Sequence, residues 1–236
     1  MKVAICIPCY GDTKADFTIS LARLVARSLA APGTPATPRL EIETFLATSS
    51  DLVANRTNLL QRAMAWQARY LLWLDADHIF PPDALLRLIA RRLPVVGCNY
   101  PRRTQPTGPV ASRIDAGGRW EHVWTTEAKA KADAVEEVAV LGLGLCLVDM
   151  LVFRDVQAHV EKGVGWENWA PFDRKRLPGT NARMGEDASF FQELREAGVK
   201  IYVDHALSWQ VGHIGERVLT NADAEKERAA FANRPG

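Results

Sequence analysis

The sequence predicts an α/β fold with a mostly parallel central sheet and helices on both of its faces. Over the first hundred of its 236 residues, short apolar segments alternate with segments whose apolar residues recur at helical spacing. The segments 3–7, 70–74 and 95–98 are apolar almost throughout, as parallel strands buried on both faces are. Helix-start patterns occur at residues 49–51 and 81–83.

The apolar patterns predict the order of strands and helices in the first hundred residues. An alternating apolar pattern predicts a further strand at residues 40–46, which pairs into the same sheet. The expected order is strand 3–7, helix 15–30, strand 40–46, a helix from residue 51, strand 70–74, a helix from residue 81 and strand 95–98.

The pattern changes after Arg103. Residues 104–137 are polar and rich in turn formers, which predicts a hairpin-like excursion and a mobile loop. The elements expected beyond it are a buried strand at 138–148, a helix at 150–160, a loop at 163–185, a helix at 186–197 closed by Gly198, a strand at 199–203 and a surface helix after residue 216.

Composition excludes several classes of function. The formal net charge of +1 gives no basic field for nucleic acid, and the apolar and charged fractions of 47% and 24% are typical of a globular protein. No apolar stretch approaches the ~20 residues of a membrane span, so we expect no transmembrane segment and a cytoplasmic protein. Cys6 and Cys9 form a C-x-x-C pair, but Cys6 lies inside an apolar strand pattern, which favours small buried residues over redox or zinc chemistry.

Asp75 and Asp77 follow a predicted central strand. Ligands of parallel sheets bind at the carboxyl ends of the strands, and two carboxylates two residues apart can face one divalent cation. A D-x-D pattern occurs by chance in many loops, but its place at a strand end favours a site for Mg²⁺ or Mn²⁺.

Glu186 and Asp187 open a predicted helix. Two interpretations fit this position: carboxylates in a first turn compensate the helix dipole, and a carboxylate beside a substrate serves as a general base.

His213 lies between Gly212 and the Ile214-Gly215 pair. Flanking glycine allows close approach of a phosphate or backbone, and an imidazole added to two carboxylates suits Mn²⁺. His205 is the competing candidate, whereas His78, His122 and His159 are expected to have no comparable setting.

Five segments, in this order, resemble those of GT-A glycosyltransferases of the family-2 type. Residues 70–77 with 80–85 resemble the D-x-D segment of this family, and residues 95–101 resemble the strand and loop that come after it. The family's later motifs are matched, in the same order, by Gly142-Leu143-Gly144, Gly185-Glu186-Asp187 and Gly212-His213-Ile214-Gly215. The resemblance covers roughly residues 2–215 and implies a GT-A, Rossmann-like fold.

The resemblance also implies an organisation of the chain. Residues 1–215 would form a single GT-A domain, with a nucleotide-binding half at 1–100 and an acceptor and catalytic half at 101–215, followed by a helical tail at 216–236. A Q-x-x-R-W-type motif after the acidic pair, typical of processive synthases, is missing, so transfer of a single sugar is expected.

The same resemblance implies roles for particular residues. Asp75, Asp77 and His213 would hold Mn²⁺ or Mg²⁺. Asp187, or Glu186, would be the catalytic base of an inverting displacement. Arg56 and Asn58 resemble an Arg-Asn donor-binding pair, although Thr57 separates them. The residues expected to bind the nucleotide sugar are Pro8, Cys9, Tyr10, Asp12, Asp51, Arg56, Asn58, Asp75 and Ala76.

The acceptor site is expected at Trp166, Trp169 and Gly144. Sugars present apolar C–H faces that stack on aromatic rings, but the same tryptophans could instead pack a long loop onto the core.

The predicted function is therefore metal-dependent transfer of one sugar from a UDP- or GDP-type donor to a hydroxyl acceptor. A nucleotidyltransferase acting on sugar phosphates is the first alternative, but it expects a glycine-rich basic loop after the first strand, which residues 8–12 do not supply. A non-catalytic nucleotide-sugar-binding module is the second, and it would be expected to lack a metal ligand or the base.

Overall fold

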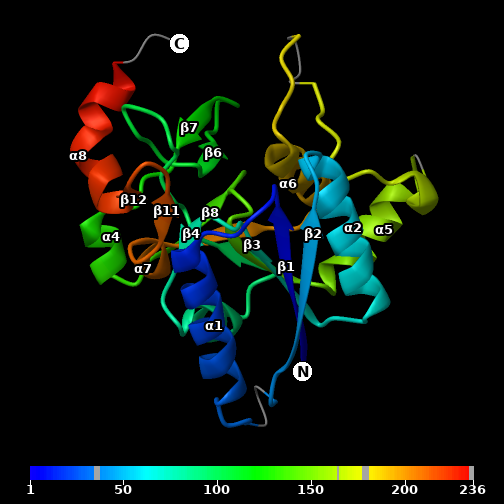
Figure 1. Cartoon of the computed structure of the whole chain (residues 1–236). Coiled ribbons are helices and arrows are strands. Elements are labelled where there is room, and N and C mark those ends of the chain that lie inside the picture. Colours follow the sequence, from blue (N-terminus) through cyan, green and yellow to red (C-terminus); the bar gives the residue numbers. More distant parts are fainter. Residues whose placement is uncertain (35–37, 164, 177–180, 234–236) are drawn as a thin grey trace.

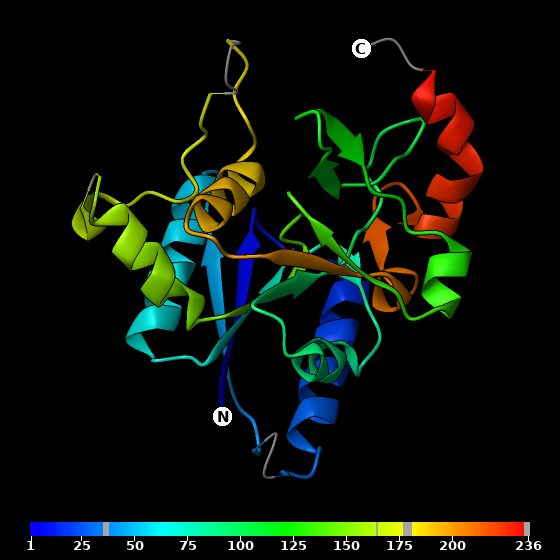
Figure 2. The ribbon, with the colours of Figure 1, turned by 180° about the vertical axis from the view of Figure 1, so that it is seen from behind.

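The chain folds around a seven-stranded mixed sheet with helices on both faces, as the computed structural model shows (Figures 1 and 2). The structure describes residues 1–34, 38–163, 165–176 and 181–233; parts of the predicted 163–185 loop and 216–236 tail lie outside the described residues. The strands of the sheet are β1 (Lys2–Cys9), β2 (Glu41–Thr48), β3 (Tyr70–Leu74), β5 (Val95–Gly97), β8 (Val135–Val138), β9 (Leu145–Asp149) and β10 (Ile201–Asp204), in the order β2-β1-β3-β9-β5-β10-β8.

Five strands of this sheet run in one direction. β1 pairs parallel with β2 and β3, and β10 pairs parallel with β5. β9 runs antiparallel between β3 and β5, and β8 is antiparallel to β10. The predicted α/β fold with helices on both faces is confirmed, and the five parallel-running strands place their carboxyl ends at one edge.

Helices cover the sheet on both sides. Their bounds are α1 (Ala15–Leu29), α2 (Leu52–Ala65), α3 (Ala84–Arg91), α4 (Glu127–Lys131), α5 (Val152–Val160), α6 (Glu186–Glu196), α7 (His205–Ser208) and α8 (Asn221–Ala232). Buried side chains of α2, α5 and α6 form one core on one face, and those of α1 and α3 form a second core on the other.

Alternation along β1 divides its side chains between these two cores. Ala4 and Cys6 belong to the core of α2, α5 and α6, whereas Val3, Ile5 and Ile7 belong to that of α1 and α3. Burial raises the pKa of the Cys6 thiol to about 12, so this cysteine is a small core residue in its neutral form.

One predicted strand is wrong in part. The segment expected as a single strand at 138–148 is divided, because β8 ends at Val138 and β9 begins at Leu145. Two glycines lie in the intervening loop and pack directly on side chains: a Cβ at Gly142 would lie 2.0 Å from the Tyr100 hydroxyl, and one at Gly144 would lie 2.5 Å from His78 Cε1. The apolar character of this loop reflects burial rather than strand pairing.

Two small sheets complete the fold. The hairpin predicted within 104–137 is present as β6 (Ser112–Ile114) and β7 (Trp120–His122), and the same stretch also supplies α4 and β8. The other small sheet has the order β12-β11-β4, from Val218–Thr220, Gly212–Ile214 and His78–Ile79. None of the helices in the described part of the chain has the length and hydrophobicity that a bilayer span requires.

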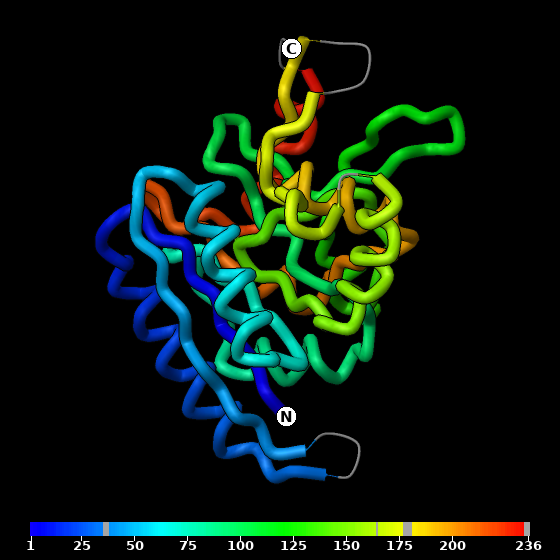
Figure 3. The backbone as a smooth tube through the Cα atoms, turned by 90° about the vertical axis from the view of Figure 1, so that its right-hand side faces the viewer, coloured from blue at the N-terminus to red at the C-terminus, as the bar shows by residue number. Residues whose placement is uncertain are grey.

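The predicted tail helix is present as α8 and packs near the β6–β7 hairpin. The ring of Phe231 lies 5.1 Å from that of His122 and 5.6 Å from that of Trp124. In Figures 1 and 3, β1 rises from the N-terminus, and α8 lies toward the end of the molecule at which β1 and β2 finish.

Candidate metal centre and cleft

A cleft of about 560 Å³ opens at the carboxyl ends of β1 and β3. This is the edge at which parallel sheets bind ligands, because the loops that follow neighbouring strands separate there. The residues lining it are Pro8, Cys9, Tyr10, Gly11, Asp12, Lys14, Leu52, Asn55, Asp75, Ala76, Asp77 and Arg103.

Most of the residues expected to bind the nucleotide sugar line this cleft. They are Pro8, Cys9, Tyr10, Asp12, Asp75 and Ala76. The side chain of Tyr10 is 78% exposed, so its ring offers a free face at the cleft. Lys14, Asn55 and Arg103 line the cleft as well, although the sequence pattern did not identify them.

Asp51 and Asn58 are placed differently from the expectation. Asp51 is the N-cap of α2, where its Oδ1 accepts the backbone N–H of Ala54 at 3.0 Å. Asn58 is exposed on α2 and does not line the cleft. Asn55, three residues earlier on the helix, lies there instead and donates from Nδ2 to the carbonyl of Cys9 at 3.3 Å.

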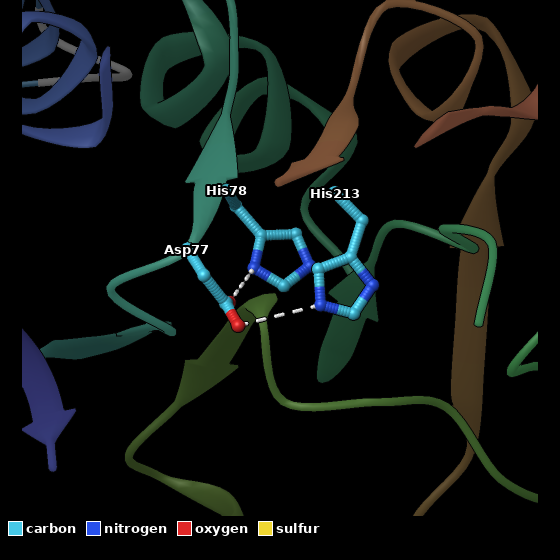
Figure 4. Close-up of side chains that lie close together, drawn as sticks. All are labelled: Asp77, His78 and His213. Carbon is cyan, nitrogen blue, oxygen red and sulfur yellow. Dashed lines mark ion pairs between the residues drawn. The ribbon is translucent and has the colours of Figure 1, made fainter. Parts of the chain in front are cut away.

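Asp77, His78 and His213 bring three potential metal ligands together (Figure 4). One ligand atom from each residue lies within 4.8 Å of the other two. Asp77 Oδ1 is 3.0 Å from His78 Nδ1, and Asp77 Oδ2 is 3.5 Å from His213 Nε2. His78 is thus a member of this cluster, and the expectation that it has no setting comparable to that of His213 is wrong.

The small sheet explains how these residues meet. β4 pairs antiparallel with β11, and His78 lies directly opposite His213 in the register. Directly opposed side chains in an antiparallel pair project from the same face, so the two rings stack at 4.4 Å with an interplanar angle of 15°. Gly212 allows this close pairing, since a Cβ there would lie 2.8 Å from Cγ1 of Ile79, its partner on β4.

The hydrogen bonds and charges of the cluster favour the binding of a cation. His213 Nδ1 donates to the carbonyl of Pro101 at 2.8 Å, which orients the ring so that Nε2 faces Asp77. Burial on its own would raise the pKa of Asp77, but His213 and His78 outweigh it and hold that pKa well below its usual range. An ionised carboxylate beside two imidazoles fits Mn²⁺ and related divalent ions.

Arg103 also contacts this carboxylate. Its Nη1 lies 2.9 Å from Asp77 Oδ2, and half of its side chain is exposed. Arg103 therefore adds positive charge at the point where the cleft meets the three-residue cluster.

Asp75 lies outside the cluster and contacts Arg56 instead. Arg56 Nη2 lies 3.1 Å from Asp75 Oδ1 and 3.2 Å from Asp187 Oδ1, and Nε lies 4.0 Å from Glu186 Oε1. The structure thus separates the expected metal set: Asp77 and His213 come together with His78, while Asp75 joins Arg56 at the cleft wall.

Arg56 is almost completely buried and does not line the cleft. Its guanidinium lies 5.5 Å from the centroid of the Trp73 ring. Burial alone would lower the pKa of Arg56, but Asp187, Asp75 and Glu186 raise it above the usual range. Arg56 is therefore a permanently charged group that pairs with Asp75 and Asp187 and lies near Glu186, and its expected contact with a donor stays a prediction.

Asp187 has an environment suited to proton transfer. Its Oδ2 accepts the backbone N–H of Leu143 at 3.0 Å. Burial, together with the charges of Asp75 and Glu186, raises the pKa of Asp187 to about 6 against the opposing effect of Arg56. A carboxylate with such a pKa is ionised at neutral pH and is a stronger base than an ordinary one.

The residues expected at the acceptor site make other contacts. The rings of Trp166 and Trp169 stack at 4.5 Å, Trp169 also packs against Phe153, and its Nε1 donates to Glu193 at 3.3 Å. These contacts pack the loop onto α5 and α6, and neither tryptophan lines the cleft. Gly144 is buried and donates its N–H to the Tyr100 hydroxyl at 3.0 Å.

Known proteins resemble this chain in structure rather than in sequence. No protein-family model matches the chain, and no curated protein matches it. Among solved structures, A197 from STIV matches with a TM-score of 0.57 at 19% identity, over 94% of this chain and 92% of that one. GalNAc-T7, solved with UDP, GalNAc and Mn²⁺, matches with a TM-score of 0.50 at 13% identity, over 91% of this chain and 44% of that one.

These matches agree with the mixed seven-stranded sheet and its flanking helices. They extend over more than nine tenths of the chain, so the likeness concerns the whole fold and not one motif. The chain has the GT-A fold of glycosyltransferases.

Proposed function

We propose that this protein transfers a single sugar, of the hexose type, from a UDP- or GDP-type donor to a hydroxyl acceptor with the help of a divalent cation. One observation carries the proposal: Asp77, a wall residue of the cleft, is also the carboxylate of the Asp77–His78–His213 cluster. A nucleotide in the cleft would therefore have its diphosphate next to the cation. The matching GalNAc-T7 structure contains UDP, GalNAc and Mn²⁺, which supports this combination of ligands.

The cleft residues suit the two ends of such a donor. The exposed ring of Tyr10 offers a stacking face for a nucleobase, and the carboxylates of Asp12 and Asp75 offer acceptors for ribose hydroxyls. Arg103 lines the cleft and contacts Asp77, so it would lie beside the diphosphate. A guanidinium at that position can bind phosphate oxygens through two hydrogen bonds.

Asp77, His78 and His213 would hold Mn²⁺ or Mg²⁺ in this protein. The bound cation supplies positive charge that stabilises the diphosphate leaving group. Asp187, which shares Nη2 of Arg56 with Asp75, would accept the proton of the acceptor hydroxyl in an inverting displacement, and the charge of Glu186 beside it helps to raise the pKa of that carboxylate.

The test is a thermal-shift panel of UDP, GDP, CDP and ADP, each with and without Mn²⁺. We expect UDP or GDP to raise the melting temperature by several degrees, and only when Mn²⁺ is present, because the cation and the diphosphate bind next to each other. Uridine and guanosine monophosphates serve as controls that keep the base but lack the second phosphate. If Mn²⁺ leaves the stabilisation by every diphosphate unchanged, the proposed donor site is wrong.

A further inference from the structure

A second pocket is lined by residues that neighbour Glu186 and Asp187 in the chain, and it shares no lining residue with the nucleotide cleft. It has a volume of about 250 Å³ and is lined by Arg102, Val110, Ser112, Trp120, Val140, Met184 and Ala188. Two of these residues lie close to Glu186 and Asp187 in the sequence, since Met184 is two residues before Glu186 and Ala188 directly follows Asp187. Figure 1 shows α6 and the β6–β7 hairpin at the same end of the molecule.

Backbone hydrogen bonds join the hairpin side of this pocket to Asp187. Ser112 and Val140 exchange both of their N–H groups and carbonyls at 3.0 Å. Three residues after Val140, the N–H of Leu143 donates to Asp187 Oδ2. The pocket wall and the carboxylate are therefore connected through the same short loop, and Ala188, the residue after Asp187, lines the pocket.

Trp120 gives this pocket an aromatic wall. Its side chain is 47% exposed, and the guanidinium of Arg195 on α6 lies 5.7 Å from the centroid of its ring. A cation–π contact at that distance holds the indole against α6. Nearly half of the ring thus remains available to a ligand.

We infer that this pocket binds one sugar ring of the acceptor, with Trp120 as the surface on which the ring stacks. This inference rests on the proposed function. The lining is mostly apolar, which suits the C–H face of a sugar, while Ser112 and Arg102 supply polar groups for its hydroxyl edge. Its volume is below the ~300–1,000 Å³ of pockets for drug-sized ligands, so it has room for a single ring rather than an extended chain.

The test uses fluorine NMR of the whole protein labelled with 5-fluorotryptophan, with UDP or GDP and Mn²⁺ present. The chain has seven tryptophans, and the Trp120 resonance is assigned by its loss in Trp120→Phe. The probes are methyl α- and β-glycosides of glucose, galactose, mannose and N-acetylglucosamine. We expect at least one to shift the Trp120 resonance saturably, while the Trp166 resonance, assigned in Trp166→Phe, stays in place because that ring is covered by Trp169.

Two results would overturn the inference. One is a Trp120 resonance that moves with none of the glycosides. The other is a shift produced by p-nitrophenol but by no methyl glycoside, which would mean that the pocket takes an apolar group. Either result leaves the proposed function standing as long as a diphosphate and Mn²⁺ still stabilise the protein together, so the two failures are distinguishable.

Discussion

Asp77→Asn is expected to abolish cation-dependent donor binding and to lower the rate of sugar transfer by roughly 10³-fold, or about 4 kcal/mol of transition-state stabilisation. The substitution keeps the size of the side chain but removes the negative charge that His78, His213 and Arg103 share. Calorimetric titration with Mn²⁺ in the presence of UDP or GDP measures the binding, and release of the nucleoside diphosphate measures the transfer.

Asp83→Asn is the matched control for this prediction. Asp83 lies in the same segment of the chain, at the N-terminus of α3, but its side chain makes no capping hydrogen bond and lies outside the cluster. We expect this variant to bind Mn²⁺ as the unmodified protein does. Unchanged Mn²⁺ affinity in Asp77→Asn would show that the cation, if required, binds elsewhere.

Asp187→Asn is expected to lower transfer by roughly 10²–10⁴-fold while leaving the Mn²⁺-dependent stabilisation by UDP or GDP nearly unchanged. The amide keeps a carbonyl oxygen to accept the N–H of Leu143 but cannot take up the proton of a hydroxyl. Glu186→Gln should have a smaller effect, since the ion pairs of Glu186 with other described residues are long, 4.0 Å to Arg56 and 3.8 Å to Arg174. An equal loss of donor binding and transfer in Asp187→Asn would mean that Asp187 holds structure instead.

The pH dependence of sugar transfer by the unmodified protein also tests the role of Asp187 as the base. The base acts only when deprotonated, and the pKa of Asp187 is raised to about 6, so transfer should rise as pH increases through about 6 and then level off. In Glu186→Gln the rise should move to lower pH, because the charge of Glu186 contributes to raising this pKa. A profile of Glu186→Gln that coincides with that of the unmodified protein would argue against Asp187 as the titrating base.

The fold was largely predictable because it depends on local patterns. The continuous apolar run of Tyr70–Leu74 is confirmed as β3, and the alternating pattern near residues 40–46 is confirmed as β2. The division of the 138–148 segment was not predictable in the same way. Its apolar residues are buried by long-range packing of Gly142 and Gly144 on Tyr100 and His78, which a hydrophobic period does not distinguish from a strand.

The site was less predictable because it is made by pairing between distant segments. The D-x-D pattern and strand-end placement pointed to Asp75 and Asp77, but only the register of β4 with β11 sets His78 against His213. The position of His78, directly after Asp77, was the one sequence feature that could have indicated its role. The partners of Arg56 lie 19 residues or more away along the chain, so sequence spacing could not show that it pairs with two carboxylates.

The proposed function requires Asp77, His78 and His213 to form a divalent-cation site at the edge of the nucleotide cleft. Electron spin-echo envelope modulation of the Mn²⁺-loaded protein tests it most directly, since this measurement detects nitrogen nuclei bound to the metal. The account predicts nitrogen modulation from imidazole that weakens in His213→Ala and is lost in the double variant with His78→Ala. Tightly bound Mn²⁺ without any nitrogen coupling, or with a coupling that survives both substitutions, would contradict it.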